Sequence, residues 1–389
     1  MKKIFPCIIM VSMFFLTPCS KQSKASIIDS QSKSFFAMDT YMTITAYGEN
    51  AGTALNQAEE RVTELEKLWS VTDENSEIYA VNHSSGASVS ISDETAELLD
   101  YSLRISDLTN GALNCTMYPI LTAWGFTTSN YQIPVETELS ALLKNTGYEK
   151  VKIDGNSVSI PENMQIDLGA VEKGYTGDLI VDILHENDIE SALLDLGGNI
   201  QTIGTKPDGT GWKLGLRSPF DEGSFATLEV SDCAVITSGG YERYFVGDDG
   251  ETYWHILDPE TGKPAHSGLV SVTIVGKEGR ICDAVSTSLF VMGLDDTFVK
   301  QITNSFIVKI ESGTIDLCFF TDFFYCDKLK IFLFKQFQKS FIHFHGSIKI
   351  LAFGFIHSFH LVFYLSLISL ASSTISKAYF FLPFSSIFL

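Results

Sequence analysis

The chain has 389 residues, of which 45% are hydrophobic, and this is enough apolar sequence to build a large folded core. Lys and Arg total 27 against 47 Asp and Glu, a net charge of −20, which excludes a general nucleic-acid binder because phosphates would be repelled. Residues 1–300 carry 20 basic and 43 acidic side chains, a net −23, whereas residues 301–389 carry 7 and 4, a net +3. The chain therefore joins two different kinds of sequence.

The first segment has the pattern of a secretory signal. Two lysines precede an apolar run over residues 4–16, which is short for a membrane-spanning helix. The run leads to Cys19 in the order Leu-Thr-Pro-Cys, which resembles a bacterial lipobox; an ordinary signal with an incidental Cys is the alternative. We expect residues 1–19 to be a signal peptide and residues 20–34 to be a flexible tether.

The middle of the chain alternates between helical and strand periodicity. Apolar residues at steps of three and four predict helices over residues 52–69, 95–108 and 175–184. Alternating or short apolar runs bounded by turn residues predict strands over residues 41–47, 192–196, 212–217, 226–230, 234–237 and 270–275. Because the strands follow one another while the helices are grouped elsewhere, we expect an α+β fold and not a doubly wound parallel sheet.

The segment from Gln165 to Tyr175 combines Asp, Gly and Lys at an expected helix start. Backbone amides at such a start, with Lys173 nearby, can hold a phosphate. A glycine-permitted turn with an N-terminal cap is the alternative. The chain has no G-x-G-x-x-G or Walker motif, so a known nucleotide-binding fold is not indicated.

Three further clusters carry candidate chemistry. His255 stands before an Asp-Pro…Thr-Gly turn, where it is either a ligand-contacting acid or base or a structural residue. Asp283 and Thr287 share a helix face and offer hard oxygens to Mg²⁺, unless Asp283 caps its own helix and Thr287 bonds back to it. The aromatic residues after the segment 111–119 could wall a flat ring system or close a loop over the core.

In this order the clusters closely resemble the ApbE family of FAD:protein FMN transferases, from about Phe36 to Gly293. The markers that carry the resemblance are Ala37-Met38-Asp39-Thr40, Asp167-Leu168-Gly169-Ala170, Lys173-Gly174-Tyr175, Leu196-Gly197-Gly198-Asn199, Thr237-Ser238-Gly239, His255 to Gly262 and Asp283 to Thr287. The resemblance implies an α+β, T-fold-related domain of mainly antiparallel sheets with packed helices, which we expect at residues 35–300.

The resemblance also implies a reaction. In this family Mg²⁺ lies at the pyrophosphate of FAD, a Thr or Ser hydroxyl of an acceptor protein attacks the FMN phosphorus, and AMP leaves. Asp283, Thr287 and the backbone carbonyl of Ala170 are then the expected Mg²⁺ ligands, and His255 and Asp283 the expected catalytic residues. The expected FAD contacts are Met38, Tyr79, Asn114, Cys115, Thr116, Asp167 and Lys173, with His255 and Ile256 near the flavin.

Two alternatives remain beside the transferase. An FAD pyrophosphatase would give FMN and AMP with water as the acceptor, and a flavin-binding lipoprotein would give no turnover. The resemblance further implies acceptor partners such as redox-pump subunits or extracellular flavoproteins, and a location at the outer face of the cell membrane through a lipidated Cys19. Asn114 departs from the family, which usually has Asp there.

The last segment, residues 301–389, contains 18 of the 29 Phe but only 3 of the 29 Gly. Its stretch 350–376 has no Lys, Arg, Asp or Glu, so its length and composition allow a transmembrane helix. A frame-shifted translation and a diverged part of the core are the other interpretations. We recognise no family-like strands after about Asp296.

Overall fold

The computed structural model describes residues 30–293, 306–311, 314–320, 330–333 and 350–353. The expected signal peptide and Cys19 lie outside the described residues, as does most of the segment 301–389. None of the helices within the described ranges is long and apolar enough to cross a membrane. Only the first four residues of the charge-free stretch 350–376 are described, and they form a strand.

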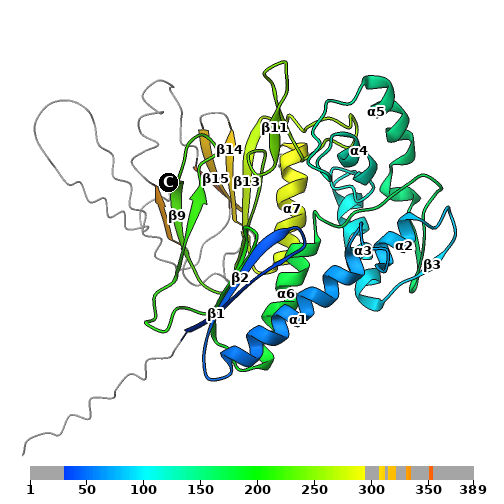
Figure 1. Cartoon of the computed structure of the whole chain (residues 1–389). Helices are drawn as coiled ribbons and strands as arrows, with labels where there is room; N and C mark the ends of the chain where they lie inside the picture. Colours follow the sequence, from blue (N-terminus) through cyan, green and yellow to red (C-terminus); the bar gives the residue numbers. More distant parts are fainter. Residues whose placement is uncertain (1–29, 294–305, 312–313, 321–329, 334–349, 354–389) are drawn as a thin grey trace, which may run out of the picture.

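A large sheet forms the centre of the described structure (Figure 1). Its strands pair antiparallel except for the parallel pair β15–β17. In spatial order they are β1 (Ser30–Ala37), β2 (Thr40–Tyr47), β6 (Ser191–Leu196), β7 (Asn199–Ile203), β10 (Ala234–Gly239), β13 (Leu269–Gly276), β14 (Phe306–Glu311), β15 (Thr314–Phe320) and β17 (Ile350–Phe353).

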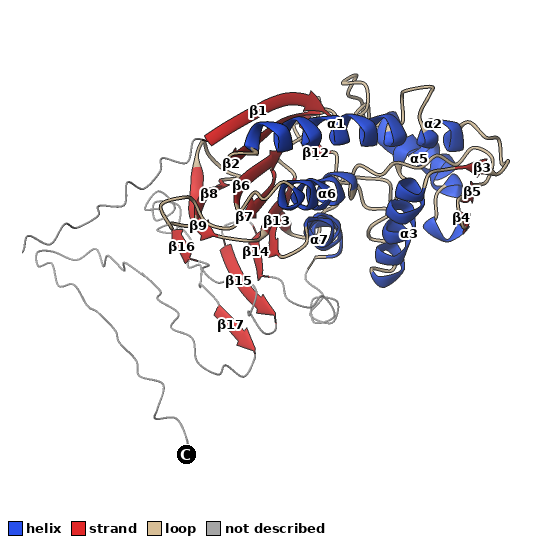
Figure 2. Ribbon diagram, turned by 90° about the horizontal axis from the view of Figure 1, so that it is seen from below, coloured by secondary structure: helices blue, strands red, loops and turns tan. Residues whose placement is uncertain are grey.

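Three long helices cover one face of this sheet: α1 (Ala51–Trp69), α6 (Glu172–Glu186) and α7 (Gly279–Met292), as Figure 2 shows. The apolar stripe of α1 packs with α6 against β2 and β6, and α7 packs against β10 and β13. A smaller sheet of β8 (Trp212–Arg217), β9 (Ser224–Val230) and β16 (Lys330–Leu333) packs its β8 and β9 side chains on the opposite face. The result is a layered α+β architecture.

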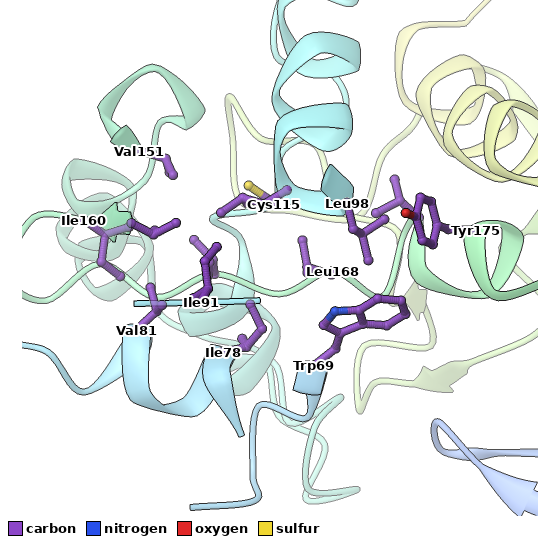
Figure 3. Packing of buried hydrophobic residues seen from close by; sticks show 14 of the residues in the cluster. Trp69, Ile78, Val81, Ile91, Leu98, Cys115, Val151, Ile160, Leu168 and Tyr175 are labelled. Carbon is purple, nitrogen blue, oxygen red and sulfur yellow. The ribbon is translucent and has the colours of Figure 1, made fainter. Parts of the chain in front are cut away.

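A second group of elements continues from the end of α1. It contains α2 (Glu77–Asn82), α3 (Asp93–Leu108), α4 (Tyr118–Ala123), α5 (Glu136–Leu142), the 3₁₀ helices η1 (Leu143–Asn145) and η2 (Tyr148–Lys150), and the strands β3 (Val89–Ser90), β4 (Lys152–Asp154) and β5 (Ser157–Ser159). Its core packs Trp69 edge-on against Tyr175 of α6, with Cys115 and Leu168 in the same cluster (Figure 3). This cluster joins the second group to the helices on the sheet. The hairpin β11 (Tyr244–Val246) and β12 (Thr252–Trp254) completes the described elements.

The structure confirms the predicted helices and strands of the middle segment, with small shifts at their ends. It differs at two boundaries. Strand β1 begins at Ser30, inside the expected tether, because Ser32 and Ser34 pair their hydroxyls with Thr45 and Thr43 across the β1–β2 ladder. At the other end, the backbones of β14 and β15 continue the sheet past β13, so the expected domain boundary at residue 300 does not mark the end of the sheet.

The N-terminal turns of α6 and α7 meet, and each is capped by a carboxylate of the other helix. Asp283 of α7 accepts a 2.8 Å hydrogen bond from the backbone N–H of Gly174, one of the amides of α6 that has no intrahelical partner. Asp178 of α6 accepts bonds from the N–H groups of Gly279 (2.6 Å) and Arg280 (3.1 Å) at the start of α7. Both carboxylates also lie at the positive ends of helix dipoles, which stabilises their charged forms.

Glycines permit this close crossing. A Cβ on Gly174 would lie 2.4 Å from the carbonyl oxygen of Gly279 and 2.6 Å from the Cβ of Asp283. A Cβ on Gly279 would lie 1.8 Å from the side-chain nitrogen of Gln201, which donates a 3.2 Å bond to the carbonyl of Gly174. The caps therefore require small residues at the contact point.

We predict that Gly174→Ala destabilises the protein, although alanine is the better helix former. Overpacking against backbone atoms that cannot move costs about 1–3 kcal/mol, which exceeds the helix-propensity gain of about 1 kcal/mol. Urea denaturation would measure the free energy of unfolding. The matched control is Gly52→Ala in α1, where a Cβ meets only the flexible end of Gln31, and its unfolding free energy should be unchanged or slightly raised. Equal effects of the two variants would contradict the crossing described here.

Candidate active site

Asp283 is the most buried carboxylate at the helix crossing, with 5% of the residue exposed. Burial raises the pKa of this carboxyl, while Lys173, the Gly174 amide and the Asn199 side chain oppose the shift. One interpretation of the sequence made Asp283 a cap of its own helix. Asp283 is a cap, but it caps α6, because its own helix already begins at Gly279. One carboxylate oxygen is used in this bond, and a buried charge of this kind gains further from a bound cation.

Thr287 lies one helical turn after Asp283 on the same face of α7, as predicted. Its hydroxyl is 3.1 Å from that of Ser238 in β10, which also lies 2.8 Å from the hydroxyl of Ser286. The bonds back into α7 are made instead by Ser286 and by Ser288. Thr287 thus belongs to a polar contact between α7 and the Thr-Ser-Gly segment of β10.

The turn before α6 brings Asp167 and Lys173 together. The Asp167 side chain accepts a 2.9 Å bond from the N–H of Gly169, and Lys173 donates a 3.1 Å bond to the Gly169 carbonyl. Burial raises the pKa of the Asp167 carboxyl, and the Gly169 amide, Lys173 and Arg243 oppose that shift. The carbonyl of Ala170 receives none of the hydrogen bonds found among the described residues, because the Gly174 N–H is taken by Asp283.

A cation could use this arrangement. An open backbone carbonyl, one carboxylate and one hydroxyl form the kind of sparse oxygen set that suits Mg²⁺ when a substrate phosphate supplies further ligands. No group of three or more His, Cys, Asp or Glu side chains in the described part of the chain is placed to hold a metal ion. The set of Ala170, Asp283 and Thr287 contains only one side chain of these four types.

The loop 111–117 is fixed by its own side chains. Asn114 accepts bonds from the N–H (3.0 Å) and hydroxyl (2.7 Å) of Thr116, whose hydroxyl accepts a 2.8 Å bond from the N–H of Gly147. Thr116 is fully buried, and Cys115 lies in the apolar cluster of Figure 3, where burial raises the pKa of its thiol to about 12. Of these three expected FAD contacts, only Asn114 retains an accessible side chain.

Two other expected FAD contacts, Met38 and Tyr79, come from other elements of the fold. Met38 occupies the β1–β2 turn with a positive φ of 49°, held by a 2.7 Å bond from its N–H to Glu66, and its sulfur faces the hydroxyl of Thr176 in α6. Tyr79 of α2 stacks on His83, the residue that follows this helix, with the ring centres 3.8 Å apart. Asn82 exchanges two hydrogen bonds with the Ile166 backbone, which ties α2 to the segment that carries Asp167.

His255 follows β12 and is held by a hydrogen bond between its Nδ1 and the backbone carbonyl of Arg243, 3.2 Å apart. Because a carbonyl only accepts, Nδ1 carries the proton and Nε2 keeps a free lone pair. Burial lowers the pKa of the imidazole to about 4, and the charges of Arg243 and Lys173 add to this effect. His255 is therefore neutral near pH 7, whereas the adjacent Ile256 is buried in the core beneath α7.

Lys173 lies close enough to three of the predicted residues to affect their ionisation. Lys173 influences the pKa values of His255, Asp167 and Asp283, which come from three distant parts of the sequence. Glu172 lies in the same field: burial raises the pKa of its carboxyl to about 8, and Asp167 and Asp283 raise it further while Lys173 opposes them.

Sequence reasoning missed three residues of this region: Glu172, Asn199 and Arg243. The first two stand inside quoted motifs, so attention to every polar position of a motif could have found them. Arg243 carries no local signal, because it reaches the site only through the β11–β12 hairpin and a 2.6 Å bond to the Phe126 carbonyl.

Known proteins resemble this chain in sequence and in structure. The family model described as "ApbE family" matches residues 38–306. FAD:protein FMN transferase of Vibrio cholerae is 33% identical over 272 residues, covering 67% of this chain and 81% of the relative. The protein of the same name from Treponema pallidum is 32% identical over 287 residues, covering 68% of this chain and 79% of the relative.

Solved structures agree with the sequence comparison. The ApbE protein of Thermotoga maritima has a TM-score of 0.68 at 30% identity, covering 80% of this chain and 99% of the other. The flavin transferase ApbE of Vibrio cholerae has a TM-score of 0.66 at 26% identity, with the same coverage of both chains. With a family match across most of its length and an α+β fold shared with these structures, the chain belongs to the ApbE family.

Proposed function

We propose that this protein transfers FMN from FAD to a Thr or Ser hydroxyl of an acceptor protein and releases AMP, with Mg²⁺ bound at Asp283, Thr287 and the Ala170 carbonyl. The names of the relatives support an FMN transfer from FAD to protein. The observation that carries the metal assignment is the buried Asp283 carboxylate, which lies at the start of α6 beside a carbonyl left without a donor.

The chemistry follows from the residues present. The acceptor oxygen forms a bond to the FMN phosphorus, the bond from that phosphorus to the AMP oxygen breaks, and the acceptor's proton moves to the free Nε2 of His255. Mg²⁺, when bound, neutralises charge on the pyrophosphate and on the departing AMP. Lys173 and the amides at the α6 start add positive potential for the same phosphates.

Burial decides which of the expected FAD contacts can use their side chains. Met38, Tyr79, Asn114, Asp167 and Lys173 have side chains that can take part. Cys115 and Thr116 are buried, so we assign them contacts through the backbone only, and Ile256 a packing role beneath the flavin.

We propose a membrane location and acceptor partners for the same enzyme. A lipidated Cys19 would hold the enzyme at the outer face of the cell membrane, where FMN-acceptor subunits of redox pumps or extracellular flavoproteins would meet it. Loss of membrane association in a Cys19→Ser variant would test this assignment.

The function is tested by incubating the protein with FAD and a tagged acceptor domain, with and without Mg²⁺, while following AMP and the acceptor's mass. Mg²⁺-dependent AMP with FMN added to the acceptor is the expected result. AMP with free FMN would favour the pyrophosphatase, and no AMP from a folded protein would favour the binding protein.

Asp283→Asn should lower the rate of Mg²⁺-dependent AMP release by about 100-fold or more, because the ligand charge that holds the cation is lost. Asp178→Asn is the matched control, since Asp178 also caps a helix at this crossing but faces Arg280, 2.9 Å away. It should lower stability and retain Mg²⁺-dependent release. The metal assignment fails if Asp283→Asn keeps the wild-type rate, or if both variants lose it equally.

The neutral state of His255 predicts a pH dependence of stability. The pKa of the imidazole is about 4 in the folded protein and near 6.5 when unfolded, so only the unfolded chain binds a proton between these values. The free energy of unfolding should therefore fall as pH drops from 6.5 to 4, by roughly 2–3 kcal/mol from this group. Denaturation at several pH values should show a shallower fall in His255→Gln than in His185→Gln, an exposed control. Parallel curves would show that His255 is not held neutral.

A further inference from the structure

Asn199 occupies a fixed place beside the helix crossing. It is the first residue of β7 and pairs with Leu196 across the two-residue turn Gly197–Gly198, whose φ values are both positive. Such a turn sets the register, and side chains two residues apart point to the same face of a strand. Gln201, on that same face, bonds the carbonyl of Gly174, so the face that Asn199 shares is turned toward α6.

The side chain of Asn199 is buried and incompletely paired. The residue is 5% exposed, and its Nδ2 has no hydrogen-bond partner among the described residues. A buried donor without a partner destabilises the folded protein, so an Asn at this place calls for an explanation. The Asp283 carboxylate is a nearby acceptor, because Gly174, whose carbonyl Gln201 bonds, donates its own N–H to that carboxylate.

We propose that Asn199 is a positioning residue for Asp283: when a cation binds, its free Nδ2–H groups donate to the carboxylate and keep it in the orientation that binds the cation. This inference rests on the proposed function. The Gly174 N–H fixes one carboxylate oxygen from the α6 side, and Asn199 offers its unpartnered donor from the sheet side. A carboxylate held by two donors keeps one direction for its remaining lone pairs, and groups that orient a ligand in this way govern metal affinity.

The test measures metal binding without turnover. Mn²⁺, which takes similar oxygen ligands to Mg²⁺, is titrated into the full chain without FAD, and the free ion is followed by electron paramagnetic resonance. Asn199→Leu should weaken Mn²⁺ binding about 10- to 100-fold. Gln201→Met is the matched control, because this residue is also buried on the same face and contacts α6. It should lower the melting temperature while leaving Mn²⁺ affinity within about twofold of wild type.

The outcomes separate the inference from the function on which it rests. Equal affinity of Asn199→Leu and wild type overturns the positioning role, as does an equal loss in both variants, which would indicate general support of the crossing. Absence of Mn²⁺ binding by the wild type would count against the proposed metal site itself. If Asn199→Leu does not fold, Asn199→Ser replaces it, since it also removes both amide N–H groups and the space left can hold water.

Discussion

Helices α6 and α7 cap each other, and this contact joins the two helices on which most of the predicted site residues near it stand. Asp283 and Asp178 each bond the opening amides of the opposite helix, across a contact so close that Gly174 has no room for a side chain. Neither carboxylate would be stable at this depth without such donors, because an unpaired buried charge costs far more than a hydrogen bond returns. The caps thus fix the helices and keep two ionisable groups in the interior.

In the proposed function, the same contact also supplies the ligands of the cation. When Asp283 takes the Gly174 amide, the carbonyl of Ala170 is left open, and the next turn of α7 presents Thr287 toward β10. Lys173 stands in the first turn of α6 and adds to the effect that lowers the pKa of His255. Under the proposed function, the contact that holds the two helices together would also gather the oxygen ligands, the Lys173 charge and the neutral His255 around a bound pyrophosphate.

Much of this was predictable because it is local. Periodicity located the long helices and most strands, and the spacing of Asp283 and Thr287 correctly placed them on one helix face. Contacts between residues distant in sequence could not be predicted from spacing. Spacing did not show that Asp283 caps α6 or that the Arg243 carbonyl bonds His255. It also did not show that the side chain of Thr116 is buried. The polar composition of the segment before residue 35 predicted a tether, but strand β1 begins within it. The reason is that Ser residues of β1 pair with threonines of β2, which composition does not show.

If the capped crossing creates the cation site, a crystal structure of the protein with FAD and Mn²⁺ will locate the metal there by anomalous scattering. We expect one peak about 2.0–2.3 Å from the Asp283 carboxylate, the Thr287 hydroxyl and the Ala170 carbonyl, with remaining ligands from the pyrophosphate. A peak bound instead by Glu172 and Asp167, away from Asp283, would contradict it.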